Sequence, residues 1–478
     1  MAKQLFKTTE KSNFILNMTE ETYSGLASKA LVLMCLIVSL FTLPSEFSDE
    51  IGYSLVSGGL AVAGVICMIL ALIAVMKKYV DKKMLFPICA FGFMLVWGLF
   101  SLIDSYDKNV SFYGFNGRGE GLLALIFYFG FFITGLTLKR EKALDTFING
   151  IIAAGILNSV WGLMQVFVPQ IPCNYRHVVG ISDDINAASG LAQSPIFLAM
   201  LLSLSLTSAI LRFVMGGSKK QRIFGLCCSA VFAFVMMFTY SVVGIFGAVF
   251  AVIAAAAAVF ITKAPKIRLA GIGAVILPAA LAVGLAAGGI VGDRNAYKLS
   301  DGSIMWMDSF NRLSSSGIYT DKAVDIKDSY DVYYFLNTKT KDIIGDYPLF
   351  GTGPENLVYP QLYASAEIEK NFNTFDKNYN EYLYTAATRG VPSLIAFAAI
   401  LLSVIIIGWK KLKNGQKGAS SAVLFALMIC GVLLFFIGNS NIVFSPIFWA
   451  AAGASCASLN KSGKGGTAGT AKSAGNKS

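Results

Sequence analysis

The chain has 478 residues, of which 55% are hydrophobic and only 14% are charged, and its mean hydropathy is +0.63. These values exclude a soluble globular domain and indicate a polytopic membrane protein. The net charge of +11 does not indicate nucleic-acid binding, because the basic residues gather in short loops, where they favour anionic membrane lipids.

Apolar runs long enough to cross a membrane recur along the chain. A helix needs about 20 apolar residues to cross a hydrocarbon core of about 30 Å. The sequence predicts an all-α fold with about twelve such helices, at residues 28–44, 54–76, 84–103, 121–138, 145–167, 194–212, 223–240, 243–262, 269–290, 391–409, 420–438 and 444–458. The last two runs are short and Pro446 interrupts the final one, so eleven is the alternative count.

The charged loops alternate along this series. Lysine and arginine cluster after each even-numbered run, at residues 77–83, 139–142, 219–222, 263–268 and 410–417. The positive-inside rule places these loops, and with them both termini, in the cytoplasm.

This topology divides the chain into five parts. They are a cytoplasmic segment at 1–27, nine helices at 28–290, a large external loop at 291–390, three helices at 391–459 and a disordered basic tail at 460–478. The external loop is the one extramembrane part large enough to build a site. A helix is expected in it at about 328–345, followed by a turn at 347–354.

Polar groups are concentrated at the end of this loop. The run from Asp376 to Leu383 reads DKNYNEYL and precedes a predicted span. It offers a cation, two carboxylates, two amides and two phenols, which can bind a phosphate or a hydroxyl group at the bilayer surface. The alternative is an ordinary polar start of a helix.

Other external loops supply further candidates. Arg118 and Arg176 lie on the face where arginine is disfavoured, and a guanidinium group matches phosphate oxygens; a lipid headgroup contact or a salt bridge is the alternative. His177 is the single histidine of the chain, either a surface residue or a proton-transfer group. The adjacent acids Asp183 and Asp184 offer too few ligands for a metal site.

Four segments, in chain order, resemble the O-antigen ligase/polymerase family of bacterial membrane glycosyltransferases. GRGEGL at 117–122 resembles the R-x-E-G-L motif of that family, and Arg176 followed by GLAQSPIFL at 190–198 resembles its arginine loop. YPLFGTGP at 347–354 is similar to its P-L-x-G-x-G-P turn. The run at 376–383, continued by Arg389, resembles its D-[RK]-x-H-N-E-Y-L segment.

The resemblance implies a metal-independent glycosyltransferase, without a cofactor, in the bacterial inner membrane. Its donor would be an undecaprenyl-pyrophosphate-linked glycan, and its acceptor a hydroxyl of a glycan or a lipid core, in surface polysaccharide assembly. By position, Arg118, Arg176 and Lys377 would contact the pyrophosphate, and Asn380 would orient the acceptor. Arg312 and Arg389 would be the spatial substitutes for family arginines that have no match in this sequence.

Two departures from the family pattern concern the chemistry. Tyr379 stands where the family has histidine, and a phenol with a pKa of about 10 is a poor general base at neutral pH. Val242 occupies the position of an external arginine. The candidates for the proton-transfer role are Glu381, Tyr379, Asp376 and His177.

Three interpretations of the resemblance stay open: an active enzyme with a different base, a divergent polymerase, or a degenerate member that binds lipid-linked glycans without transferring them. A transporter or flippase of lipid-linked glycans is the alternative outside this family. It would carry ionisable groups in the middle of several spans. The predicted spans are nearly free of charge, and Asp145 lies near the end of its run, which favours an interfacial enzyme.

Overall fold

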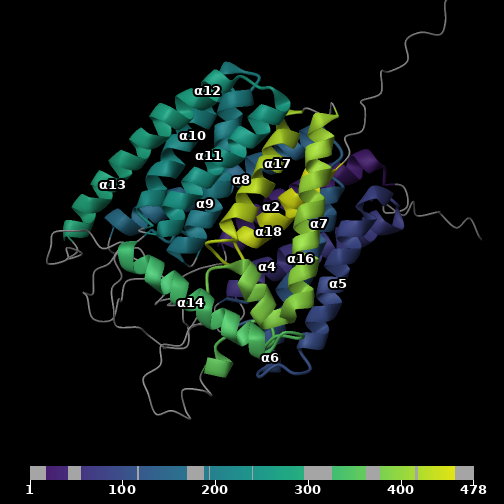
Figure 1. Cartoon of the computed structure of the whole chain (residues 1–478). Coiled ribbons are helices and arrows are strands. Elements are labelled where there is room, and N and C mark those ends of the chain that lie inside the picture. The colour runs from purple at the N-terminus through teal and green to yellow at the C-terminus, as the bar shows by residue number, and fades with distance from the viewer. Residues whose placement is uncertain are drawn as a thin grey trace, which may run out of the picture.

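The computed structural model describes residues 18–40, 55–115, 118–168, 188–192, 194–239, 241–294, 326–361, 377–414 and 418–457. Within these ranges the regular elements are helices, and no strand occurs (Figure 1). They are α2 (Glu20–Leu40), α4 (Leu55–Met76), η1 (Lys82–Met84), α5 (Leu85–Ser101), α6 (Lys108–Tyr113), α7 (Leu122–Leu136), α8 (Glu141–Phe167), α9 (Pro195–Met215), α10 (Lys219–Met237), α11 (Val242–Thr262), α12 (Lys266–Gly271), η2 (Ile272–Ile276), α13 (Leu277–Arg294), α14 (Ile326–Asp346), α16 (Glu381–Lys413), α17 (Ala419–Leu434) and α18 (Phe444–Cys456).

The fold is that of an all-helical polytopic membrane protein, as predicted. Among the described residues, eight helices are long and apolar enough to cross a membrane: Glu20–Leu40, Gly58–Met76, Lys82–Ser101, Glu141–Phe167, Pro195–Met215, Lys219–Met237, Val242–Thr262 and Glu381–Lys413. A helix also lies at each of the other predicted positions, but α7, α17 and α18 have only 15, 16 and 13 residues. Eight candidate spans are therefore supported, and the count of twelve is not confirmed.

The basic loops gather at one end of the molecule, which we term the basic end (residues 77–83, 139–142, 216–222, 263–268, 410–414 and 418). There the Lys139 ammonium lies 2.7 Å from Glu20 and 3.5 Å from Asp81, joining the starts of α2 and η1 to the loop before α8. The backbone N–H of Ser420 donates to Glu141, joining α17 to α8. The loops of the opposite end, which we term the pocket end, comprise residues 114–115, 118–121, 347–361, 377–390 and 438–441.

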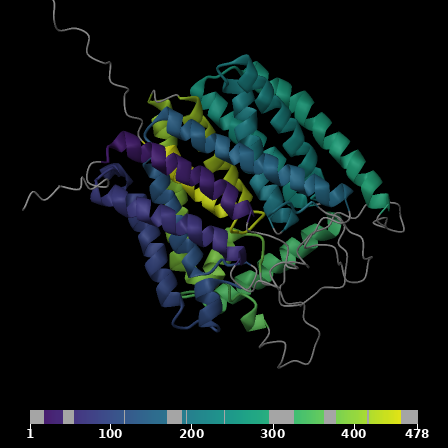
Figure 2. The same cartoon turned by 180° about the vertical axis from the view of Figure 1, so that it is seen from behind.

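The helices pack closely around α9 and α18. All but three residues of α9 are buried, and it contacts α8, α10, α11 and α17. Helix α18 is buried along its whole length and crosses α7, where a Cβ atom at Gly135 or Gly453 would overlap a backbone carbonyl of the other helix. Small residues at such crossings let helix backbones approach each other. Seen from behind, the N-terminal helices lie in front of the C-terminal ones (Figure 2).

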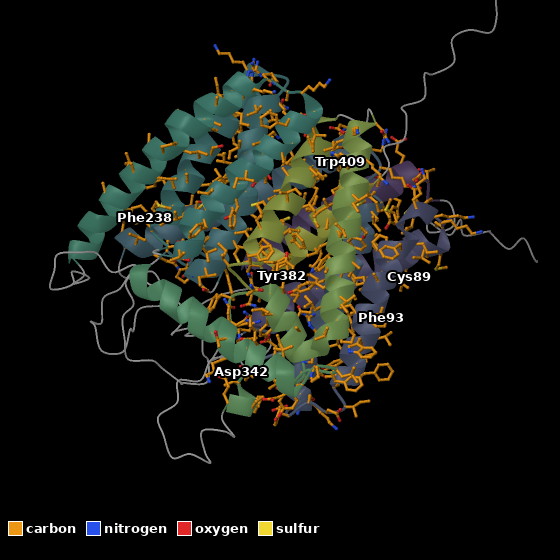
Figure 3. The ribbon with its side chains drawn as sticks, viewed as in Figure 1. Cys89, Phe93, Phe238, Asp342, Tyr382 and Trp409 are labelled. Carbon is orange, nitrogen blue, oxygen red and sulfur yellow. The ribbon has the colours of Figure 1, made fainter. Side chains whose placement is uncertain are left out.

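Helix α14 confirms the helix expected in the external loop and lies across the pocket end (Figure 1). It contacts α16, and Ile343 packs in a small apolar cluster with Leu357, Tyr384 and Ala387. Asp342 lies on the exposed side of α14, while Tyr382 marks the start of α16 and Trp409 lies near its other end (Figure 3). The helix therefore packs against the first turns of α16.

Candidate functional site

A break in α16 shapes the pocket end. Gly390 has φ 81° and ψ 163°, so α16 consists of a short segment before Gly390 and a long one after it. The freed backbone groups pair with the turn that follows α14: Thr352 N–H donates to Ala387 O (2.9 Å), Gly353 N–H to Thr388 O (2.9 Å), and Val391 N–H to Pro348 O (2.8 Å). Because buried carbonyl and N–H groups need partners, these bonds make the two motifs at 347–354 and 376–390 one structural unit.

The first turn of α16 is capped by its own polar residues. Asn380 is the N-cap, and its side chain accepts from the N–H of Leu383 at 3.1 Å. Asn378 in turn accepts from the N–H of Asn380 at 3.2 Å. The interpretation of this run as a polar helix start is thus correct for its amides, which satisfy free N–H groups of the helix.

Lys377 is the centre of a buried charge cluster. Its ammonium lies 2.7 Å from a carboxylate oxygen of Glu355 and 3.1 Å from one of Glu120, and 4.3 Å from the ring centre of Tyr384. The lysine side chain is only 2% exposed. A buried cation is stable only when carboxylates or rings replace water around it.

Glu355 links Lys377 to Arg118, in the loop before α7. One oxygen of Glu355 accepts from Lys377 and from the hydroxyl of Tyr384, the latter at 2.6 Å. The other lies 3.7 Å from the Arg118 guanidinium, which also lies over the ring of Phe115 at 5.0 Å. The loop before α7 and the loop after α14 therefore meet through charged side chains.

Glu381 occupies a neighbouring position with four hydrogen-bond donors. Its Oε1 accepts from Arg389 at 3.1 Å and from the Thr385 hydroxyl at 3.3 Å. Its Oε2 accepts from the backbone N–H of Ser440 at 2.9 Å and from the side-chain amide of Asn439 at 3.3 Å. Glu381 therefore connects the short first segment of α16 to the loop between α17 and α18.

Glu120 completes the set of buried carboxylates. Its Oε1 accepts from two hydroxyl groups, Ser440 at 3.0 Å and Tyr128 at 3.2 Å, while its Oε2 accepts from Lys377. Its side chain is 4% exposed.

Burial and neighbouring charges shift the ionisation of this cluster. Burial raises the pKa of the Glu120 carboxyl; Lys377 lowers it, Glu355 and Glu381 raise it, and the net direction is upward. Burial acts in the same direction on Glu355, but Lys377 and Arg118 outweigh it, so the pKa of Glu355 falls below its usual value. Burial lowers the pKa of Lys377, but Glu120 and Glu355 raise it well above its usual value.

The cluster borders a pocket whose empty space, including the part open to solvent, is about 560 Å³. Its lining includes the charged residues Glu120, Glu355, Lys377, Glu381 and Arg389. It also includes the apolar residues Met94, Leu125, Phe397, Phe435 and Trp449. The pocket therefore offers hydrogen-bonding and charged groups beside a hydrophobic surface.

The structure brings several predicted site residues together. Lys377, Glu381 and Arg389 line the pocket, and Arg118 lies beside Glu355 in its wall. Each of these cations has a carboxylate within 3.7 Å, so for Arg118 the structure shows the salt bridge that the sequence offered as an alternative.

Other predicted residues have different positions. Tyr379 is buried with its N–H donated to Asn439 at 2.6 Å, and it is not among the residues lining the pocket. Four predicted site residues lie outside the described residues: Arg176, His177, Arg312 and Asp376.

The prediction missed Glu120 and Glu355, the two partners of Lys377. Glu120 stands within the quoted GRGEGL motif and Glu355 directly after the quoted turn, so their proximity to the motifs was the available signal. Asn439 and Ser440 were missed as well; a polar Asn-Ser-Asn triplet between two apolar runs was their signal.

No protein-family model matches the sequence, and no curated protein is similar to it. In the part of the chain that the structure describes, no group of three or more histidine, cysteine, aspartate or glutamate side chains is arranged to hold a metal ion. The chemistry of the pocket must therefore be argued from its own residues.

Proposed function

We propose that the protein is a membrane glycosyltransferase that resembles O-antigen ligases and polymerases. It transfers a glycan from an undecaprenyl-pyrophosphate donor to an acceptor hydroxyl at the pocket end. The basic end faces the cytoplasm of a bacterial cell, since lysine and arginine loops favour that side. The pocket end then faces outward from the inner membrane.

The observation that carries this proposal is a pocket with a mixed lining at the end of the helical bundle. The charged residues Lys377, Arg389 and Glu120 line it together with aromatic side chains such as those of Phe397 and Trp449. A lipid-linked glycan has the matching composition, because its sugar and phosphate groups need hydrogen bonds while its isoprenoid needs apolar contact.

The cations give the pocket a means of stabilising a leaving group. In the proposed reaction, Lys377 and Arg389 share their charge between their carboxylate partners and the pyrophosphate oxygens. Charge-assisted hydrogen bonds become stronger as the anomeric carbon–oxygen bond breaks and negative charge accumulates on the phosphate. Arg118, one carboxylate away, adds to the positive potential.

A transfer assay tests the proposal. The full-length protein in lipid nanodiscs receives a labelled undecaprenyl-pyrophosphate glycan with either a free glycan or a lipid-linked acceptor. We expect release of undecaprenyl pyrophosphate and a labelled product, and the acceptor that works distinguishes polymerase from ligase. Arg389→Ala reduces the rate by about 10²-fold or more, whereas Lys339→Met, on the exposed side of α14, leaves it unchanged.

Two results would contradict the proposal. Movement of the labelled donor between leaflets of a proteoliposome, without release of undecaprenyl pyrophosphate, would identify a flippase. Saturable donor binding without release with any acceptor would identify a degenerate binding protein.

A further inference from the structure

The buried carboxylates Glu120, Glu355 and Glu381 border the same pocket but have different hydrogen-bond donors. Glu355 lies between two cations, Lys377 and Arg118, which favour its ionised form. A proton on Glu355 would therefore meet positive charge on both oxygens.

Glu381 is surrounded mainly by N–H donors, which cannot become acceptors. The orientation of the Asn439 side-chain amide is fixed, because its carbonyl oxygen accepts from the Tyr379 N–H and its NH₂ group therefore faces Glu381. The N–H of Ser440 and the guanidinium of Arg389 are donors only. A proton on Oε2 of Glu381 would face two donors with no acceptor. On Oε1 it would face the Arg389 guanidinium and the single hydroxyl of Thr385, whose oxygen already accepts from Arg389.

Glu120 differs because its Oε1 accepts from two hydroxyl groups, those of Ser440 and Tyr128. A hydroxyl group donates or accepts by rotating, so either one can accept a proton placed on this oxygen. Ser440 has a further partner for its own proton, since its oxygen lies 2.8 Å from the Ser445 hydroxyl. Glu120 can thus take up a proton without leaving a buried donor unsatisfied.

We infer that Glu120 is the proton acceptor for the incoming hydroxyl group, in the place of the histidine that Tyr379 replaces. This inference rests on the proposed function. The acceptor oxygen forms a bond to the anomeric carbon of the donor, and the bond from that carbon to the pyrophosphate oxygen breaks. The bonding electrons leave with the pyrophosphate, and the hydroxyl proton moves to a carboxylate oxygen of Glu120. Glu120 returns the proton to water when the products leave.

The surroundings of Glu120 suit this role. The titratable groups facing it are Tyr128 on α7, Lys377 before α16, and the carboxylates of Glu355 and Glu381. Burial raises the pKa of Glu120 despite the opposing charge of Lys377. A base is more effective when its pKa approaches the working pH.

The test compares Glu120→Gln, Glu120→Asp and Glu381→Gln in the nanodisc transfer assay across about pH 5 to 9. We expect Glu120→Gln to lower kcat by about 10²- to 10⁴-fold, the usual contribution of a general base, with little change in the KM for the donor. The acidic limb of the pH–rate profile disappears. Glu120→Asp keeps the acidic limb at a reduced rate, and Glu381→Gln keeps it too. A Glu120→Gln variant with the wild-type profile would overturn the inference.

A second measurement tests the same point without turnover. Infrared difference spectra of the full chain, recorded during a pH titration, should contain a carboxylic acid C=O band that is missing from Glu120→Gln and present in Glu381→Gln. Absence of such a band from the wild type would overturn the role of Glu120. A wild-type protein that shows the band but transfers no glycan would contradict the proposed function and leave Glu120 as a proton-binding group.

Discussion

The ammonium group of Lys377 lies 2.7 Å from the carboxylate of Glu355, and the two side chains are 2% and 1% exposed. The same ammonium reaches Glu120, which is 257 residues away in the chain. One lysine thus forms ion pairs with two carboxylates from different loops. A buried charge that loses its partner is costly, so this lysine should be important for folding as well as for activity.

Lys377→Met should lower the free energy of unfolding by about 3–5 kcal/mol, the usual cost of breaking a buried ion pair from one side. The methionine leaves Glu120 and Glu355 buried together without their shared cation. Thermal or denaturant unfolding in detergent measures the change. The matched control is Lys339→Met, whose ion pair with Asp342 is exposed and should contribute only about 0–1 kcal/mol.

The double variant Lys377→Met with Glu355→Gln should be more stable than the sum of the two single changes, because the second change removes a stranded charge. If Lys377→Met unfolds like the wild type, the buried cluster does not form in solution.

Glu355→Gln should change how stability depends on pH. The pKa of Glu355 lies below its ordinary value of 4.5, because Lys377 and Arg118 outweigh the effect of burial. Its ionised form therefore stabilises the folded chain above the pKa of the unfolded state, and this stabilisation is lost as the pH falls through the folded-state pKa. The difference in Tm between wild type and Glu355→Gln should be largest near neutral pH and shrink in acid. A difference that is constant with pH would contradict this role.

Gly390→Ala should destabilise the pocket end. Gly390 has a φ of 81°, and a Cβ atom there would overlap the backbone carbonyl of Leu349. Backbone strain of this kind costs about 1–3 kcal/mol before the clash is added, so we expect a lower Tm and a lower transfer rate. The control is Gly92→Ala in α5, where no atom lies within 4 Å of the added Cβ. An unchanged Tm for Gly390→Ala would show that the turn at 347–354 can move away.

Local patterns in the sequence were sufficient to predict the helices, because apolar runs and basic loops are features of neighbouring residues. The start of α16 could be foreseen in the same way, since Asn380 caps it. The number of spans could not be predicted in this way. A short helix such as α18 is buried by its neighbours, and packing determines its place. Tertiary packing has no local signature in the sequence.

The cations of the site and Glu381 were predicted, whereas Glu120 and Glu355 were missed. Arg118 was singled out because arginine is disfavoured in the loops expected outside the membrane, and Lys377 because it belongs to a dense polar run before a predicted span. Glu120 and Glu355 look like ordinary loop acids until the fold brings them to Lys377. Pairing across 257 residues cannot be deduced from either residue alone.

Tyr379→His should restore the family pattern without raising the transfer rate. Tyr379 is 2% exposed, and it has a left-handed backbone with φ 55°. Histidine adopts this conformation more readily than most residues, so the variant should fold. Its imidazole would replace a ring that does not line the pocket and would lie beyond the reach of an acceptor hydroxyl.

Initial rates of glycan transfer, compared with those of Tyr379→Phe in protein of equal Tm, measure the effect. Both variants should transfer at or below the wild-type rate, because the proton goes to Glu120. A gain of about 10²-fold or more in Tyr379→His, the contribution expected of a new general base, would place the proton acceptor at position 379 instead. It would also identify the wild-type site as degenerate, because a single imidazole would then accept the proton that Glu120, Glu355 and Glu381 do not accept.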